Sequence, residues 1–280
     1  MKINELPNAV ANFVRGFTQI PEAEGILLAG SRATNTYDSE SDYDIYVYSN
    51  ETIPVEARRG IFKDLFDYIE VNNQFWETED DGYLRDGHIP VEIIYRDINF
   101  IVQNLQNKLE RFQADVGYTT CIWANFIGSE ILFDKNGMLR SLQNSYRIPY
   151  PPELKLNIIR KNYPLLKSQM PAYYHQIEKA LKRGDIISIN HRITAFLASY
   201  FDIVFALNEI PHPGEKKLLR IIKEQCRKVP ECWEQNIREV LKRSGSCDPA
   251  IMPALDQLMN SLKELLVREK IINSPASDLE

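Results

Sequence analysis

The sequence predicts an α+β protein with two domains, a β-sheet flanked by helices followed by an all-α helical bundle. In the first half, short apolar runs alternate with segments of helical periodicity. Residues 149–152 then contain three prolines in four positions, and such a run cannot continue a helix. Beyond them, apolar residues recur only at helical spacing. We therefore expect one domain over residues 1–147 and a second over residues 153–280.

The composition is that of an ordinary globular protein. The chain has 280 residues, of which 44% are hydrophobic and 26% charged, enough for one large or two modest domains. It has no apolar run of membrane-spanning length and no signal-peptide pattern at residues 1–13. Its four cysteines lack a CxxC spacing, so they indicate reduced thiols. We expect a cytoplasmic protein with no membrane partner.

Charge is distributed unevenly along the chain. Residues 1–150 carry 13 Lys and Arg against 23 Asp and Glu, a net of −10. Residues 151–280 carry 20 against 16, a net of +4, and the whole chain has a net charge of −6. This balance argues against a dedicated nucleic-acid-binding protein, which usually has a strong basic patch. The acidic half suits a metal ion, and the mildly basic half suits an anion.

Periodicity and turn residues predict the elements of the first domain in order. The expected elements are a helix over 5–20, a strand over 25–29, a short helix over 31–37, a strand over 42–48, a helix over 55–70, an edge strand with a loop over 72–87, a strand over 89–95 and a helix over 98–112. Residues 119–134 are apolar, and their last residues form the end of a strand or of a helix, which leads into a turn at Gly137.

The second domain is predicted to be entirely helical, with five or six helices. Asp185 is the expected N-cap of its longest helix. The expected helices cover 153–168, 171–183, 185–208, a segment with Lys216, Lys217 and Arg220 in its first turns, 231–243 and 250–270.

Two aspartates at the start of the 42–48 strand mark a candidate site. Side chains two residues apart on a strand share a face, so Asp42 and Asp44 converge. Two adjacent like charges are costly unless a cation lies between them or one is protonated. A divalent metal ion is the simplest explanation.

Two further features complete a coherent set. Gly30 and Ser31 follow the 25–29 strand, and the first N–H groups of the next helix, with the Ser31 hydroxyl, are available to an anion such as phosphate. Glu92 is the one acid in the apolar 89–95 strand. With Asp42 and Asp44 it forms an oxygen ligand set of the kind that Mg²⁺ prefers. The other phosphate-binding patterns, GxxxxGK[ST] and GxGxxG, are absent.

These residues carry a family resemblance. The run Gly30-Ser31-Arg32-Ala33, then Ser41-Asp42-Tyr43-Asp44, with Glu92 on a later strand, resembles the signature of the DNA polymerase β-like nucleotidyltransferase superfamily. The layout is similar to that of bacterial nucleotidyltransferases that adenylate aminoglycosides and lincosamides. The resemblance covers residues 24–96, and residues 207–217 are similar to a branch with a helical C-terminal domain. It implies that residues 1–147 form a nucleotidyltransferase fold with a mixed sheet.

The resemblance also implies an activity: Mg²⁺-dependent transfer of AMP from ATP, or of another nucleoside monophosphate, to a hydroxyl of a small acceptor with release of pyrophosphate. Asp42 and Asp44 would ligate metal, and Gly30 and Ser31 would bind phosphates. Glu92 stands where many relatives have Asp, and it would be either a metal ligand or the general base.

The resemblance leaves two possible roles for each of three basic residues. Arg32 would neutralise phosphate charge or brace its loop through a carboxylate such as Asp38. Lys216 and Lys217 would reach the triphosphate or form a solvated helix face.

Two other functions are compatible with the sequence. One is a nucleotidyltransferase that modifies a protein or an RNA end. The other is a non-catalytic binding module, such as one partner of a toxin–antitoxin pair that has kept the fold. The intact set of Asp42, Asp44 and Glu92 counts against the second. The acceptor and the oligomeric state are not specified by the sequence.

Overall fold

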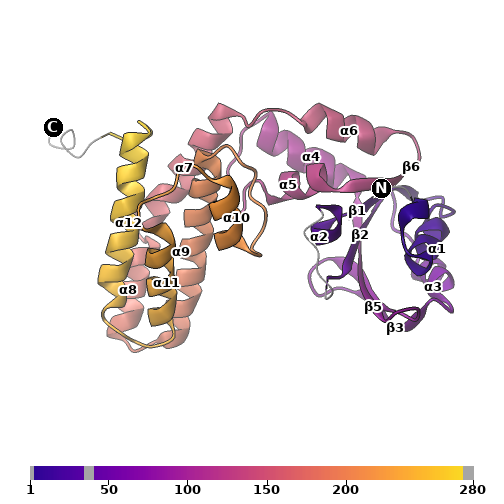
Figure 1. Cartoon of the computed structure of the whole chain (residues 1–280), viewed down its shortest axis with the longest axis horizontal. Coiled ribbons are helices and arrows are strands. Elements are labelled where there is room, and N and C mark those ends of the chain that lie inside the picture. The colour runs from indigo at the N-terminus through magenta and orange to yellow at the C-terminus, as the bar shows by residue number, and fades with distance from the viewer. Residues whose placement is uncertain (1–2, 35–40, 274–280) are drawn as a thin grey trace. The chain divides into compact units, whose positions relative to one another are not determined.

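The computed structural model describes residues 3–34 and 41–273. The chain forms two compact units, one of residues 1–107 and 122–148, the other of residues 108–121 and 149–280 (Figure 1). The first contains a mixed sheet with helices and the second is helical, which confirms the predicted α+β class. Residues 108–121 group with the second unit although they precede residue 147. The division into domains 1–147 and 153–280 stays a prediction.

A six-stranded sheet in the order β3-β4-β5-β2-β1-β6 forms the first unit. Strands β2 and β5 are parallel, and the other neighbouring pairs are antiparallel. The strands are β1 (Ala23–Leu28), β2 (Tyr43–Ser49), β3 (Phe66–Asn73), β4 (Thr78–Leu84), β5 (Ile89–Asp97) and β6 (Glu130–Asp134). The predicted strands at 25–29, 42–48 and 89–95 are therefore confirmed, as β1, β2 and β5.

Two helices cover one face of this sheet. Phe13 and Phe17 of α1 and Phe62 of α3 belong to one apolar core with Ile45 and Ile93 of the sheet. The opposite face receives α5, whose Phe126 packs edge-on against the Tyr48 ring at 6.2 Å. The helices of this part of the chain are η1 (Ile3–Glu5), α1 (Asn8–Phe17), α2 (Gly30–Ala33), α3 (Val55–Phe62), α4 (Ile98–Leu109), α5 (Cys121–Gly128) and α6 (Met138–Tyr146).

The predicted helix over 55–70 is wrong in its second half. Helix α3 stops at Phe62, and Asp64 has a left-handed backbone with φ of 65°. Residues from Phe66 onward form β3, which pairs with β4 in a hairpin. The helical spacing of the apolar residues is misleading here, because the strand is stabilised by cross-strand pairing with β4, which helical periodicity does not take into account. The strand predicted within residues 72–87 exists as β4, but it is an internal strand between β3 and β5 and not an edge strand.

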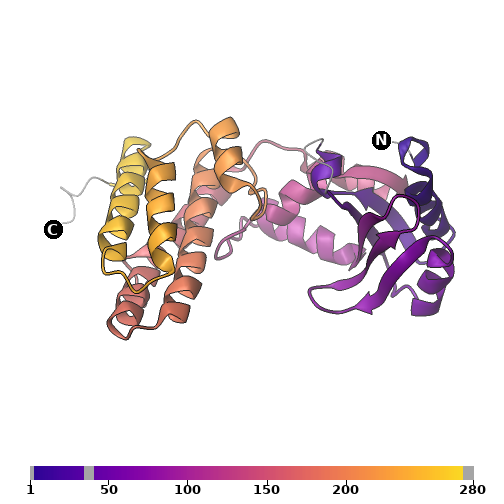
Figure 2. The ribbon, with the colours of Figure 1, turned by 60° about the horizontal axis from the view of Figure 1, so that its bottom comes forward.

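The second unit is a bundle whose helices lie side by side (Figure 2). The predicted cap is confirmed, since the Asp185 side chain accepts a hydrogen bond from the Ser188 N–H at 3.0 Å. No helix in the described ranges is long and apolar enough to cross a bilayer. The helices are α7 (Pro152–Leu166), α8 (Tyr173–Lys182), α9 (Ile186–Leu207), α10 (Leu218–Gln225), α11 (Trp233–Ser244) and α12 (Ile251–Arg268).

Buried polar contacts attach residues 108–121 to this bundle. Asp202 of α9 accepts hydrogen bonds from the Thr119 N–H at 3.1 Å and the Thr119 hydroxyl at 2.7 Å. Asn162 of α7 accepts one from the Gly117 N–H at 3.0 Å. Burial raises the pKa of Asp202 to about 7 and lowers the pKa of His212, which is also fully buried, to about 4. These contacts explain why a segment between two helices of the sheet unit groups with the bundle.

Candidate functional site

The three predicted carboxylates meet at one end of the parallel pair β2 and β5. Asp44 is the direct register partner of Glu92, and Asp42 lies two residues before Asp44, on the same face. One carboxylate oxygen from each of the three lies within 4.8 Å of those of the other two, and all three residues are partly exposed. Local strand geometry explains the approach of Asp42 and Asp44, whereas the parallel register brings in Glu92.

This cluster is electrostatically unfavourable without a cation. Burial, and next the charge of Asp44, raise the pKa of Glu92 to about 7. Among the described residues, no Lys or Arg forms an ion pair with Asp42 or Glu92. Carboxylates held this close together gain from a bound divalent ion, which lowers their mutual repulsion. Oxygen ligands of this kind fit Mg²⁺.

Gly30 brings the backbone against this cluster. Its φ of 62° lies in the left-handed region, and it is the first residue of α2. A Cβ atom at this position would lie 1.6 Å from Oδ2 of Asp44, so any side chain would displace the carboxylate. The backbone at Gly30 therefore lies against the Asp44 carboxylate, as a phosphate bound by this turn and by a metal ion at the acids would require. Of the predicted helix over 31–37, residues 35–37 lie outside the described residues.

Arg32 braces the start of β2. Its Nε donates to the backbone carbonyl of Asp42 at 2.9 Å and to that of Ser41 at 3.2 Å. Its guanidinium lies 4.1 Å from the centre of the Tyr43 ring. These contacts support the bracing role, although through backbone carbonyls, and the suggested partner Asp38 lies outside the described residues. A contact of Arg32 with phosphate stays a prediction.

The prediction that Lys216 and Lys217 lie in the first turns of a helix is wrong. Helix α10 begins after them, at Leu218, and Lys217 is its N-cap residue with φ of 58°. A lysine in the left-handed region cannot continue the regular helix, so the carbonyl of Lys217 accepts the first helical bonds, from Arg220 and Ile221. Both lysines belong to the second unit, and their contact with a triphosphate stays a prediction.

A second pair of acids, not among the residues predicted for the site, lies beside Glu92. Glu79 and Asp81 stand two apart on β4, and Asp81 is the register partner of Glu92. Carboxylate oxygens of Glu79, Asp81 and Glu92 also lie within 4.8 Å of one another. Strand β5 thus places Glu92 between two i, i+2 acidic pairs, one at the start of β2 and one on β4. The same spacing in residues 79–81 is the available signal, but the sequence predicts only an edge strand with a loop somewhere within residues 72–87.

An open hollow of about 380 Å³ adjoins the acids. Its lining includes Asp42, Glu92, Asp81 and Glu70, which is the register partner of Asp81 on β3. Exposed aromatic side chains, among them Tyr68, form part of its wall. Acidic groups and aromatic faces favour a cationic group in such a hollow.

Comparisons with known proteins show a partial family match and a similar solved structure. A family described as a domain of unknown function (DUF4037) matches residues 120–218, less than half of the chain. No curated protein matches the sequence. The chain is similar to a solved nucleotidyltransferase-like protein from Exiguobacterium sibiricum, with 11% identity over 92% of this chain and 72% of that one. The TM-score is 0.43. The resemblance to aminoglycoside and lincosamide enzymes stays a prediction.

Proposed function

We propose that this chain is a Mg²⁺-dependent nucleotidyltransferase that transfers a nucleoside monophosphate, AMP from ATP, to a hydroxyl of a small acceptor. One observation carries the proposal: oxygens of Asp42, Asp44 and Glu92 lie within 4.8 Å of one another, directly beside Gly30, where a Cβ atom would collide with Asp44. A carboxylate cluster against an exposed backbone turn suits a metal-bound triphosphate.

The residues present fit the ion. All three side chains offer hard oxygen ligands, and their partial exposure leaves room for water and phosphate oxygens in the coordination shell. When bound, Mg²⁺ would neutralise triphosphate charge and align the attacking and leaving oxygens.

The residues of the chain would act as follows. Gly30 and Ser31 bind the phosphates, and Arg32 keeps Asp42 in place. The acceptor oxygen forms a bond to the α-phosphorus, the bond from that phosphorus to the oxygen bridging to the β-phosphate breaks, and pyrophosphate leaves with that oxygen. The hydroxyl proton needs an acceptor. The pKa of Glu92 near 7 suits a general base at neutral pH, and its alternative role is that of a third metal ligand.

The hollow beside the acids supports an acceptor that carries amines as well as hydroxyls. Glu70 and Asp81 lie on its acidic wall with Tyr68, and a protonated amine would interact favourably with both kinds of group. Aminoglycoside- and lincosamide-like compounds have this chemistry. RNA would meet an acidic surface here, so we expect it to be the poorer acceptor.

The test is pyrophosphate release from each nucleoside triphosphate with Mg²⁺, against a panel of aminoglycosides, lincosamides, hydroxylated compounds without amines, RNA and proteins. We expect activity with an amine-bearing small acceptor. The double variant Asp42→Asn/Asp44→Asn should lose on the order of 10³-fold in rate, because the metal ion that binds the phosphates would lose two carboxylate ligands.

The matched control is Glu56→Gln, a change of an exposed acid on α3, which should leave the rate unchanged. Pyrophosphate release that survives the double aspartate substitution would contradict the proposed site. Activity on RNA or a protein in place of small molecules would keep the site and overturn the acceptor class.

A further inference from the structure

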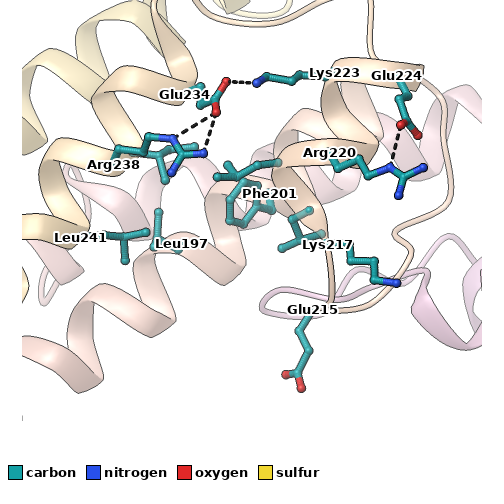
Figure 3. A pocket seen from close by; sticks show the side chains of 13 residues that line it. Leu197, Phe201, Glu215, Lys217, Arg220, Lys223, Glu224, Glu234, Arg238 and Leu241 are labelled. Carbon is teal, nitrogen blue, oxygen red and sulfur yellow. Dashed lines mark hydrogen bonds and ion pairs between the residues drawn. The ribbon is translucent and has the colours of Figure 1, made fainter. Parts of the chain in front are cut away.

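The helical unit contains an open pocket of about 720 Å³, and its lining includes none of Asp42, Asp44 and Glu92. Helices α9, α10 and α11 surround it, and Figure 3 shows the side chains that line it. Leu197 and Phe201 of α9 and Leu241 of α11 form its apolar floor. Its size is that of a site for a small molecule.

Leu241 is the exposed apolar residue of this floor. It is 46% exposed although it lies on the same helix as the buried Ile237 and Val240. A large aliphatic side chain left open beside Leu197 and Phe201 adds to an apolar surface that a ligand could cover. The floor therefore favours an apolar molecular body over a polar one.

The charges at the edge of this floor are not balanced. Glu234 accepts from two cations, with Nζ of Lys223 at 2.6 Å and Nη2 of Arg238 at 2.8 Å. Hydrogen bonds donated by these two cations lower the pKa of Glu234, and the bond from Lys223 has the larger effect. Glu234 is therefore ionised at neutral pH. Two cations share one anion, which leaves one positive charge.

The other acids of the cavity do not cancel that charge. Glu224 is bound by Arg220 at 2.7 Å on α10. Glu215 points away from the Glu234 group, as Figure 3 shows. Arg238 uses Nε and Nη2 on Glu234, and Nη1 has no partner among the described residues. A guanidinium edge with an unused N–H is well suited to a carboxylate.

We propose that this cavity binds a small amphiphile, an aliphatic body bearing one carboxylate, with the body on Leu197, Phe201 and Leu241 and the carboxylate at Arg238 and Lys223. The charge of the site selects against a cationic head group, and the floor selects against a wholly polar ligand. This site is independent of the nucleotidyltransferase proposal, and either can fail alone.

The test is calorimetric titration of the full chain with decanoate below its critical micelle concentration. Decanol and decyltrimethylammonium serve as neutral and cationic probes of the same chain length. We expect saturable binding of one decanoate, and binding of the cationic probe weaker by about tenfold or more. Leu241→Glu should abolish decanoate binding, and Arg238→Gln should weaken it by about tenfold.

The matched control is Ile187→Glu, which changes an exposed aliphatic residue of α9 outside this cavity. This variant should bind decanoate as tightly as the unmodified chain does. Thermal unfolding of each variant checks that it is folded. The proposal is overturned if decanoate shows no saturable binding, if Leu241→Glu binds equally well, or if the cationic probe binds as tightly. It is also overturned if ultracentrifugation shows a dimer that Leu241→Glu dissociates, since a second copy would then cover this face.

Discussion

Asp80 and Asp81 are neighbours on β4 and lie on opposite faces of the sheet, where their charges have different environments. Asp80 is fully buried on the face covered by α1 and α3. It pairs with Nη1 of Arg58 at 2.8 Å and accepts from the Tyr95 hydroxyl at 2.6 Å. Asp81, on the other face, lies with Glu92 among carboxylates. It accepts one hydrogen bond, from Nδ2 of Asn73 at 3.0 Å, and among the described residues it has no ion pair.

The difference separates structural acids from acids that can serve a ligand. The charge of Asp80 is compensated within the protein, so its environment is complete. The carboxylates around Glu92 repel one another, and the pKa of Glu92 rises to about 7 chiefly through burial and then through Asp44. Such a cluster lowers stability in the absence of a cation and can gain it back when one binds.

The largest effect should come from breaking the compensated pair. Asp80→Ala leaves the buried guanidinium of Arg58 without its anion, so we expect the free energy of unfolding to fall by about 3–5 kcal/mol. Urea denaturation measures it. The neighbouring change Asp81→Ala is the control, and it should alter the free energy by less than about 1 kcal/mol. Equal losses from the two variants would remove the distinction between the faces.

Asp202 offers a third case, a buried carboxylate held mainly by neutral donors. Its pKa in the folded state, about 7, lies above the ordinary value of 3.8. The folded state therefore binds the proton more tightly, and stability falls as pH rises from about 4 to about 7, by at most about 1.4 kcal/mol per pH unit. His212 acts in the opposite direction, because its lowered pKa, about 4, costs stability as pH falls below 6.5.

Comparison of the unmodified chain with Asp202→Asn isolates the contribution of Asp202, since His212 is present in both. Urea denaturation at several pH values should show that their difference in unfolding free energy changes steadily from pH 4 to pH 7. A difference that does not depend on pH would mean that Asp202 is ionised throughout this range.

Gly30→Ala tests the approach of the backbone to the acids. The new Cβ would meet Oδ2 of Asp44, and alanine is strained at φ of 62°. We expect a loss of about 1–3 kcal/mol in unfolding free energy, with loss of the proposed activity. Gly60→Ala on α3, where no atom lies within 4 Å of the new Cβ, should instead stabilise by about 0.5–1 kcal/mol. Similar results for both would show that Gly30 is not constrained by Asp44.

The smallest expected effect has the opposite sign to that of Asp80→Ala. In EDTA, Glu92→Gln should raise the unfolding free energy by up to about 1 kcal/mol, because it removes a like charge from the cluster. Mn²⁺ should raise the melting temperature of the unmodified chain by mass action and have a smaller effect on Glu92→Gln. A variant stabilised by Mn²⁺ as strongly as the unmodified chain would show that Glu92 is not a ligand.

Local pattern was sufficient for much of this protein. The apolar runs at 25–29 and 89–95 could be assigned because their length and residue types suit buried strands, and Asp185 because a cap depends only on the next turn. The i, i+2 spacing of Asp42 and Asp44 follows from the geometry of a single strand. The α+β class and the candidate acids, including Glu92, were therefore accessible from the sequence.

Tertiary structure decided what depends on contacts between separate elements. The pairing of β3 with β4 overrode the helical spacing after Phe62, and the β4–β5 register brought Asp81 to Glu92. The buried contacts of Thr119 with Asp202 attach residues 108–121 to the bundle. Alternation along β4 sends Asp80 to Arg58 and Asp81 to the open acidic cluster, because only the assembled sheet determines which face is covered.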